Sequence, residues 1–133
     1  MPLKYLNAPD AAPAPPTAKY SHAVEAGSTL YVTGQLPADP DNLEATLPPG
    51  IEAQTHLVFK NLIRIVEHAG YSLADTAFAR VYLTEFTRDY PGMNKVYAEY
   101  FPEDARLPGR TTVGVTALAR AALVEIDLIV VKG

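Results

Sequence analysis

The sequence predicts a single α+β domain over residues 1–133, and three observations lead to this fold class. The chain has 133 residues, of which 48% are apolar and 20% charged, a size and composition typical of one globular domain. Apolar residues recur every three or four positions over residues 51–69, whereas they alternate with polar ones over residues 76–86. Predicted strands and helices are interspersed along the chain, which favours a sheet with helices on one face.

The first half of the chain predicts an extended lead-in, a strand, a long loop and a helix. Residues 1–17 form a Pro-rich segment, and four prolines within residues 8–16 exclude helix and favour an extended conformation. Residues 29–35 carry β-branched and aromatic side chains, which predict a strand. Residues 36–50 contain four prolines and predict a loop of a length that is often functional. A helix follows over residues 51–69, with Gly70 at its C-terminal cap.

The second half predicts a strand over residues 76–86, a helix over residues 89–101 with Pro91 near its start, and strands over residues 110–117 and 123–131. In the last strand, alternate residues from Val124 to Val130 are apolar, so we expect the helices to cover that face. The opposite face mixes acidic and apolar residues, among them Glu125 and Asp127. Such a face suits a subunit interface better than a solvent-exposed surface.

Composition argues against several classes of function. The formal net charge is −4 and no run of Lys or Arg occurs, which counts against nucleic-acid binding. The absence of cysteine excludes disulfides, thiolate metal sites and a cysteine nucleophile. The spacing of His22, His56 and His68 matches no metal-binding pattern. No signal peptide and no apolar run near the ~20 residues of a membrane span are found, so we expect a cytoplasmic protein without membrane contact.

Arg110 and Glu125 are the candidate chemical groups. If the last two strands pair as a hairpin with a turn near residues 119–121, Glu125 lies opposite residue 115 and Arg110 lies about five positions away at ~3.3 Å per residue. That gap leaves room for a small ligand. A guanidinium offers paired donors that match a carboxylate, and a glutamate can orient or deprotonate a water. The pair therefore indicates hydrolysis of a carboxylate-bearing compound, while spacing alone favours an ordinary surface salt bridge of Arg110.

The chain resembles the Rid family of reactive intermediate/imine deaminases, also called YjgF-like proteins, from about residue 18 to residue 131. The resemblance is carried by segments that occur in the family's order and at its spacing. These segments are Tyr20-Ser21-His22-Ala23-Val24, Val32-Thr33-Gly34-Gln35-Leu36-Pro37, Gly50-Ile51-Glu52-Ala53-Gln54-Thr55, Asn94-Lys95-Val96-Tyr97-Ala98-Glu99-Tyr100-Phe101-Pro102, Pro108-Gly109-Arg110-Thr111-Thr112-Val113 and Leu123-Val124-Glu125-Ile126.

The resemblance implies a chorismate-mutase-like α+β subunit, in which two helices cover one face of a mixed sheet. It also implies a homotrimer with ligand clefts between neighbouring subunits. The implied activity is attack of water on 2-imino or enamine acids, which yields 2-keto acids and ammonia without a metal or an organic cofactor. The implied partner is therefore a small carboxylate-bearing imine, enamine or keto acid.

Position by position, the resemblance implies that Arg110 binds the substrate carboxylate and that Glu125 positions the attacking water. Thr112 stands where many members have cysteine, and its backbone N–H is implied to bind the same carboxylate. The other implied substrate contacts form the floor of the cleft or close it: Tyr20, Thr33, Gly34, Tyr90 and Asn94.

The sequence also departs from the family pattern. Ala18-Lys19 replaces a common Gly-Pro, His22 replaces a glutamine, Gly109 replaces the alanine before Arg110, and Ala119 replaces a proline. The changes at Lys19, His22 and Ala119 alter the expected rim of the cleft, so the substrate range stays open. Other readings are a keto-acid binder without catalysis and a specialised aminomuconate-type deaminase. RNA cleavage or translation inhibition is disfavoured by the acidic charge.

Overall fold

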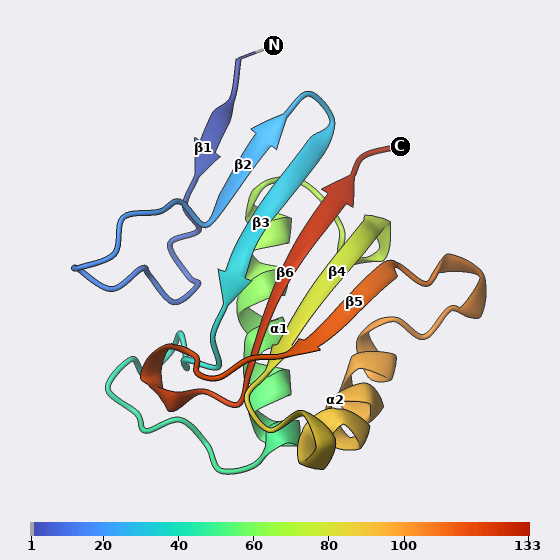
Figure 1. Ribbon diagram of the computed structural model, residues 1–133. Coiled ribbons are helices and arrows are strands. Elements are labelled where there is room, and N and C mark those ends of the chain that lie inside the picture. The colour runs from blue at the N-terminus through green and yellow to red at the C-terminus, as the bar shows by residue number, and fades with distance from the viewer. Residues whose placement is uncertain (1) are drawn as a thin grey trace.

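The computed structural model describes residues 2–133 and consists of one mixed sheet with two helices on the same face (Figure 1). The six strands of the sheet lie in the order β1-β2-β3-β6-β4-β5. Of the five pairings between neighbouring strands in residues 2–133, only that of β4 with β5 is parallel. The elements are β1 (Lys4–Leu6), β2 (Ala23–Ala26), β3 (Thr29–Gln35), α1 (Ile51–His68), β4 (Thr76–Leu83), α2 (Phe86–Tyr100), β5 (Gly109–Gly114) and β6 (Val124–Val131). The predicted α+β class and the placement of both helices are confirmed.

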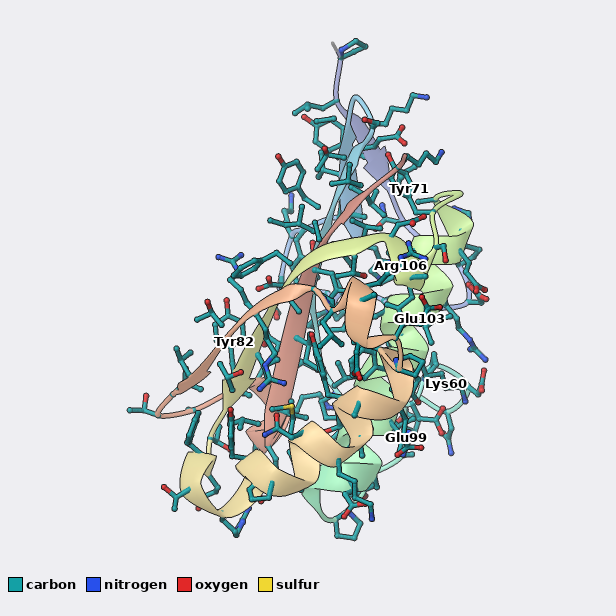
Figure 2. The ribbon with its side chains drawn as sticks, turned by 90° about the vertical axis from the view of Figure 1, so that its right-hand side faces the viewer. Lys60, Tyr71, Tyr82, Glu99, Glu103 and Arg106 are labelled. Carbon is teal, nitrogen blue, oxygen red and sulfur yellow. The ribbon has the colours of Figure 1, made fainter. Side chains whose placement is uncertain are left out.

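The core lies between the sheet and α1. Alternate residues of β4 and β6 point toward the helices, and each of these side chains is at most 1% exposed: Ala79, Val81, Leu83, Val124, Ile126, Leu128 and Val130. The facing stripe of α1 is formed by Val58, Phe59, Leu62, Ile65 and Val66. Burial of each large apolar side chain contributes roughly 1.5–3 kcal/mol, so this layer fixes the sheet against the helix. In Figure 2 the helices lie on one side of the sheet and Tyr82 on the other.

Helix α1 ends where the sequence predicts. Gly70 has φ +81°, a left-handed conformation that costs glycine little. Its N–H donates to the Glu67 carbonyl at 3.0 Å, and the N–H of Tyr71 donates to the Val66 carbonyl at 3.0 Å. These two bonds satisfy carbonyls that the helix end leaves free, as expected for a glycine C-cap.

The predicted hairpin of the last two strands is wrong. Strand β5 lies at the edge of the sheet and pairs in parallel with β4, whereas β6 lies between β3 and β4. Helix α2 connects β4 to β5, and a crossover of this kind is what parallel neighbours require. The chain then returns from β5 to β6 through a 3₁₀ turn, Ala119–Ala121, in which Arg120 and Ala121 have φ values of 59° and 54°.

Several boundaries also differ from the prediction. The strand predicted over residues 76–86 ends at Leu83, and the strand predicted over residues 110–117 ends at Gly114. Helix α2 begins at Phe86 rather than residue 89, so Pro91 lies in its second turn and offers no N–H to the preceding turn. Strands β1 and β2 were not predicted from the sequence. Strand β1 is short and lies in the Pro-rich segment, and β2 has only four residues.

Candidate functional site

The predicted site residues fall on opposite faces of the sheet within one chain. Arg110 pairs with Ala79 of β4, whose side chain points toward the helices. Glu125 pairs with Tyr82, which points away from them. Directly paired residues of neighbouring strands share a face, so the two candidate groups point in opposite directions. The predicted hairpin arrangement, with room for a small ligand between the two groups of one chain, is therefore wrong.

We call the first set the arginine half-site; it comprises Tyr90, Asn94, Tyr97, Arg110 and Thr112. Arg110 Nη2 donates to the hydroxyl of Tyr90 at 3.3 Å. The guanidinium carbon lies 4.7 Å from the ring centroid of Tyr97 and 5.8 Å from that of Tyr90. Aromatic faces at these distances attract a cation and hold the guanidinium between β5 and α2.

Arg110 has no ionic partner within the described chain. None of the ion pairs formed among residues 2–133 includes Arg110. The ordinary salt bridge that spacing alone favoured is therefore absent from residues 2–133. A half-buried guanidinium held by aromatic rings keeps its paired donors available for an anion.

Three buried polar atoms accompany Arg110 without a hydrogen-bond partner among residues 2–133: Asn94 Oδ1, Tyr97 OH and Thr112 Oγ1. An unsatisfied buried polar group costs about 1–3 kcal/mol, so such a cluster is typical of a site completed by another molecule. Tyr97 is 8% exposed, and burial raises the pKa of its hydroxyl while the charge of Arg110 opposes the rise. The hydroxyl therefore stays protonated at neutral pH and is able to donate.

Sequence reasoning did not single out Tyr97 as a site residue. The signal was its position three residues after Asn94 and seven after Tyr90, which places all three on one helix face.

We call the second set the glutamate half-site; it comprises Tyr20, Thr33, Gly34 and Glu125. The pairing of β3 with β6 shifts register between Val32 and Gln35, and Gly34 lies within this bulge. A Cβ on Gly34 would collide with the Glu125 carboxylate, so only glycine permits this close approach. Burial, and then the charge of Asp127, raises the pKa of Glu125.

Tyr20 and Thr33 are positioned by a contact between β3 and the segment that precedes β2. The hydroxyl of Thr33 donates to the carbonyl of Ser21 at 2.6 Å, and burial, followed by the charge of Glu125, raises the pKa of Tyr20. The structure thus brings Tyr20, Gly34 and Glu125 together, while Thr33 uses its hydroxyl to hold the chain beside them.

The residues that depart from the family pattern have different roles. His22 is buried and not at the rim, because its Nδ1 accepts the N–H of Ala8 at 3.0 Å and its Nε2 lies 2.8 Å from the carbonyl of Ala12. Gly109 is explained by Phe78, whose ring carbon would lie 2.7 Å from a Cβ at that position. Ala119 lines a cavity beside Tyr20.

The described residues, 2–133, contain neither a cluster of metal ligands nor a membrane-spanning helix. Among residues 2–133, no three His, Asp or Glu side chains gather closely enough to hold a metal ion. Over the same range, no helix has the length and apolar character needed to cross a membrane.

Comparison with known proteins identifies a family. The model of the family described as endoribonuclease L-PSP matches residues 10–132. A RutC family protein of Sulfurisphaera tokodaii is 43% identical over 89% of this chain and 91% of its own. The 3-aminoacrylate deaminase RutC of Acinetobacter baylyi is 39% identical over 92% of this chain and 94% of its own. A 2-iminobutanoate/2-iminopropanoate deaminase of Dermatophagoides farinae is 34% identical over 87% of this chain and 88% of its own.

Solved structures support the same relationship. A protein of Thermotoga maritima described as a putative endoribonuclease superposes with a TM-score of 0.88, is 34% identical and matches over 98% of each chain. TdcF of E. coli, solved with bound serine, superposes with a TM-score of 0.88, is 30% identical and matches over 98% of this chain and 99% of its own.

Proposed function

Because the chain belongs to the endoribonuclease L-PSP family, which is the YjgF/Rid family, we propose that it is a deaminase of small 2-imino or enamine acids. The observation that carries the proposal is the arginine half-site. Arg110 is half-buried, has no carboxylate partner among residues 2–133 and is flanked by buried polar atoms without partners. Relatives named as 3-aminoacrylate and 2-iminobutanoate/2-iminopropanoate deaminases support the choice of substrate.

The site would form between two copies of the chain. The arginine and glutamate half-sites lie on opposite faces of one sheet, so a complete set requires the arginine half-site of one copy and the glutamate half-site of the next. A head-to-tail contact of this kind closes into a ring. We propose a homotrimer with three equivalent clefts, as the family resemblance implies.

Each half-site would have a separate task. Arg110 and the backbone N–H of Thr112 bind the carboxylate and place C2 of the imino acid against the glutamate half-site. Glu125 takes a proton from a water as the water oxygen bonds to C2. The electron pair of the C=N π bond moves to the nitrogen, which takes up that proton and leaves a carbinolamine. The C–N bond then breaks as the hydroxyl proton of the carbinolamine passes by way of Glu125 to the departing nitrogen and the carbonyl of the keto acid forms. One water and one imino acid thus give one keto acid and one ammonia.

The raised pKa of Glu125 suits this exchange. A carboxyl whose pKa lies nearer the working pH both accepts and returns a proton more readily than an ordinary glutamate.

The test is the release of keto acid or ammonia from 2-iminobutanoate generated in solution. Replacing Arg110 by alanine removes the charge that holds the substrate, so we expect kcat/KM to fall by roughly 100-fold or more. Arg110→Lys keeps the charge but loses the paired donors, so its kcat/KM should lie between those of Arg110→Ala and the parent. Arg106→Ala is the control, because Arg106 pairs with Asp75 at 2.9 Å on the surface. If Arg110→Ala retains the parent rate, the proposed role of Arg110 is wrong.

The second candidate is a keto-acid binder without catalysis, because the same arginine half-site would bind a 2-keto acid equally well. Calorimetry with 2-ketobutyrate, run beside the imine assay, separates the two. Binding without turnover would favour the binder. A panel that adds larger enamines of the aminomuconate type tests the specialised deaminase in the same experiment, and RNA cleavage is disfavoured by the net charge of −4.

A further inference from the structure

A cavity of about 330 Å³ opens beside the glutamate half-site. Three segments form its walls: residues 12–16 of the Pro-rich segment, residues 34–43 at the end of β3 and in the following loop, and the 3₁₀ turn Ala119–Ala121. Tyr20 and Gly34 belong both to this cavity and to the glutamate half-site. The cavity therefore borders the glutamate half-site through these two residues.

The walls of the cavity are mainly apolar. Its apolar lining includes Pro13, Pro15, Leu36 and Leu43, and the single charged side chain in the lining is that of Arg120. The guanidinium of Arg120 donates to the carbonyl of Ala45 at 3.3 Å, which directs it toward the loop of residues 36–50. A space of this volume and chemistry falls within the range in which proteins enclose small apolar groups.

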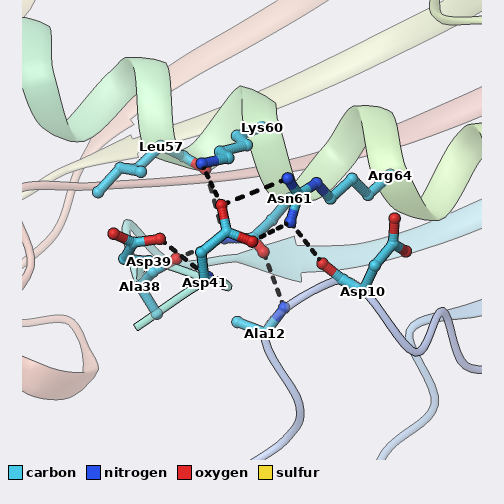
Figure 3. A network of polar contacts seen from close by, with 9 residues as sticks. All are labelled: Asp10, Ala12, Ala38, Asp39, Asp41, Leu57, Lys60, Asn61 and Arg64. Atoms are coloured by element: carbon cyan, nitrogen blue, oxygen red, sulfur yellow. Dashed lines mark hydrogen bonds and ion pairs between the residues drawn. The ribbon is translucent and has the colours of Figure 1, made fainter. Parts of the chain in front are cut away.

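Two walls of the cavity are fixed by one buried side chain of α1, Asn61, which is 0% exposed. Its Oδ1 accepts the N–H of Ala12 at 2.8 Å, and its Nδ2 donates to the carbonyl of Ala38 at 2.8 Å (Figure 3). Ala12 and Ala38 both line the cavity. One amide therefore sets the separation of the Pro-rich segment from the loop that follows β3.

Charged groups reinforce the same contact. Arg64 donates to the carbonyl of Asp10 at 2.8 Å and pairs with Asp41 at 2.9 Å, while Lys60 pairs with Asp41 at 2.7 Å (Figure 3). The walls are thus held in place before any ligand enters, and a preformed cavity loses less entropy when it binds.

The third wall carries local strain. Arg120 and Ala121 both adopt left-handed backbone conformations, which glycine favours and other residues rarely adopt. Strain of this kind collects at functional sites, where the surrounding structure holds it. Here it bends the return from β5 so that Ala119 and Arg120 close the cavity.

We propose that this cavity receives the side chain of the substrate and selects imino acids with apolar side chains of about four or more carbons over those with a methyl group. The inference rests on the proposed deaminase activity and adds the substrate class to it. The carboxylate would lie at Arg110 of the neighbouring copy, C2 in front of Glu125, and the apolar chain among the prolines and leucines.

The test compares imines generated in solution from alanine, leucine and glutamate. An apolar pocket discriminates by roughly tenfold or more per methylene, so we expect kcat/KM for the leucine-derived imine to exceed that for the alanine-derived one by at least tenfold. Ala14→Phe fills the cavity and is expected to lower kcat/KM for the leucine-derived imine by about tenfold more than kcat/KM for the alanine-derived one. Ala105→Phe, on an exposed 3₁₀ turn, is the matched control.

Each outcome decides one question. Failure of the parent to turn over any imine refutes the deaminase activity, whereas turnover of all three without preference for leucine refutes only the pocket. Preference for the glutamate-derived imine would refute the apolar assignment in favour of Arg120. If Ala14→Phe is inactive on every substrate, Leu43→Ala decides instead. Leu43 lies in an exposed loop, and Leu43→Ala removes part of the apolar wall of the cavity. This variant should lower kcat/KM for the leucine-derived imine more than for the alanine-derived one. An equal loss on both substrates refutes the pocket.

Discussion

Burial in the glutamate half-site also determines how Glu125 affects stability. Its pKa is raised from the ordinary value of 4.5, so the ionised form is disfavoured in the folded chain. A group of this kind stabilises fully below its unfolded pKa and loses that contribution as the pH rises through its folded pKa. We therefore expect Glu125→Gln to be more stable than the parent at pH 7, with a difference that disappears near pH 4.

Urea denaturation at the two pH values measures the effect of Glu125→Gln. Glu103→Gln is the control, because Glu103 is exposed, and its midpoint should match the parent at both pH values. A gain for Glu125→Gln that persists unchanged at pH 4 would show that the cost of burying the ionised carboxylate beside Asp127 is not its cause.

The predictability of individual residues depended on what they contact. Arg110 and Glu125 could be singled out because a guanidinium and a carboxylate have recognisable chemistry, although spacing alone suggested a salt bridge for Arg110. His22 was misplaced because its partners are the backbone groups of Ala8 and Ala12, which carry no sequence signal. From the sequence, Gly109 could be recognised only as a departure from the family pattern, because the ring of Phe78 that explains it belongs to another strand.

Helix α1 acts as the support of two irregular segments, and Asn61 is its central contact. Asn61→Leu leaves the N–H of Ala12 and the carbonyl of Ala38 unpaired. Each unsatisfied buried group costs about 1–3 kcal/mol, so we expect the free energy of unfolding to fall by about 2–4 kcal/mol. Amide hydrogen exchange should accelerate in residues 10–16 and 36–43 more than in the sheet.

Asn42→Leu provides the matched control for this variant. Asn42 lies exposed in the same loop, so its replacement should leave both stability and exchange near the parent values. Uniform acceleration of exchange across the sheet in Asn61→Leu would mean that Asn61 supports the whole fold rather than the two segments.

The predicted elements were most accurate where a periodic pattern was long. The 18 residues of α1 repeat an apolar stripe often enough to define both ends, and Gly70 marks the second one. The pairing of β5 was predicted wrongly because neighbours in sequence were taken as neighbours in the sheet. The helix between β4 and β5 was the available clue, since parallel strands need such a crossover. The four-residue β2 is too short to show a period.

One chain exposes a sheet face that a second chain is suited to cover. Tyr31, Val113 and Val131 are exposed on the face away from the helices. Beside them, Asp127 accepts from Arg80 at 2.8 Å and from Tyr82 at 3.0 Å. Exposed apolar side chains around such a network of charged and polar groups are typical of an interface. The sequence indicated this from the mixed face of β6. The proposed division of the site between two copies, which the family resemblance also implies, is supported by the register of β5, β4 and β6.

That division leads to a test of the assembly itself. Arg110→Ala and Glu125→Gln should each be inactive alone, because every cleft lacks one group. If each cleft takes its two groups from different copies, mixed trimers contain some clefts with both groups intact. Random assembly from equal amounts should then restore about a quarter of the parent activity in the whole population, and about a third in the trimers that contain both variants.

Co-expression of the two variants with different affinity tags, followed by purification on both tags, isolates the mixed assemblies, and sedimentation gives their size. Arg110→Ala mixed with a chain that carries both substitutions is the control, because no combination of these chains places an intact arginine opposite an intact glutamate. Activity in the first mixture and none in the control would locate the cleft between copies. Inactivity of both mixtures, with the parent active, would mean that Arg110 and Glu125 of a single chain serve the same reaction, which their opposite directions in the sheet argue against.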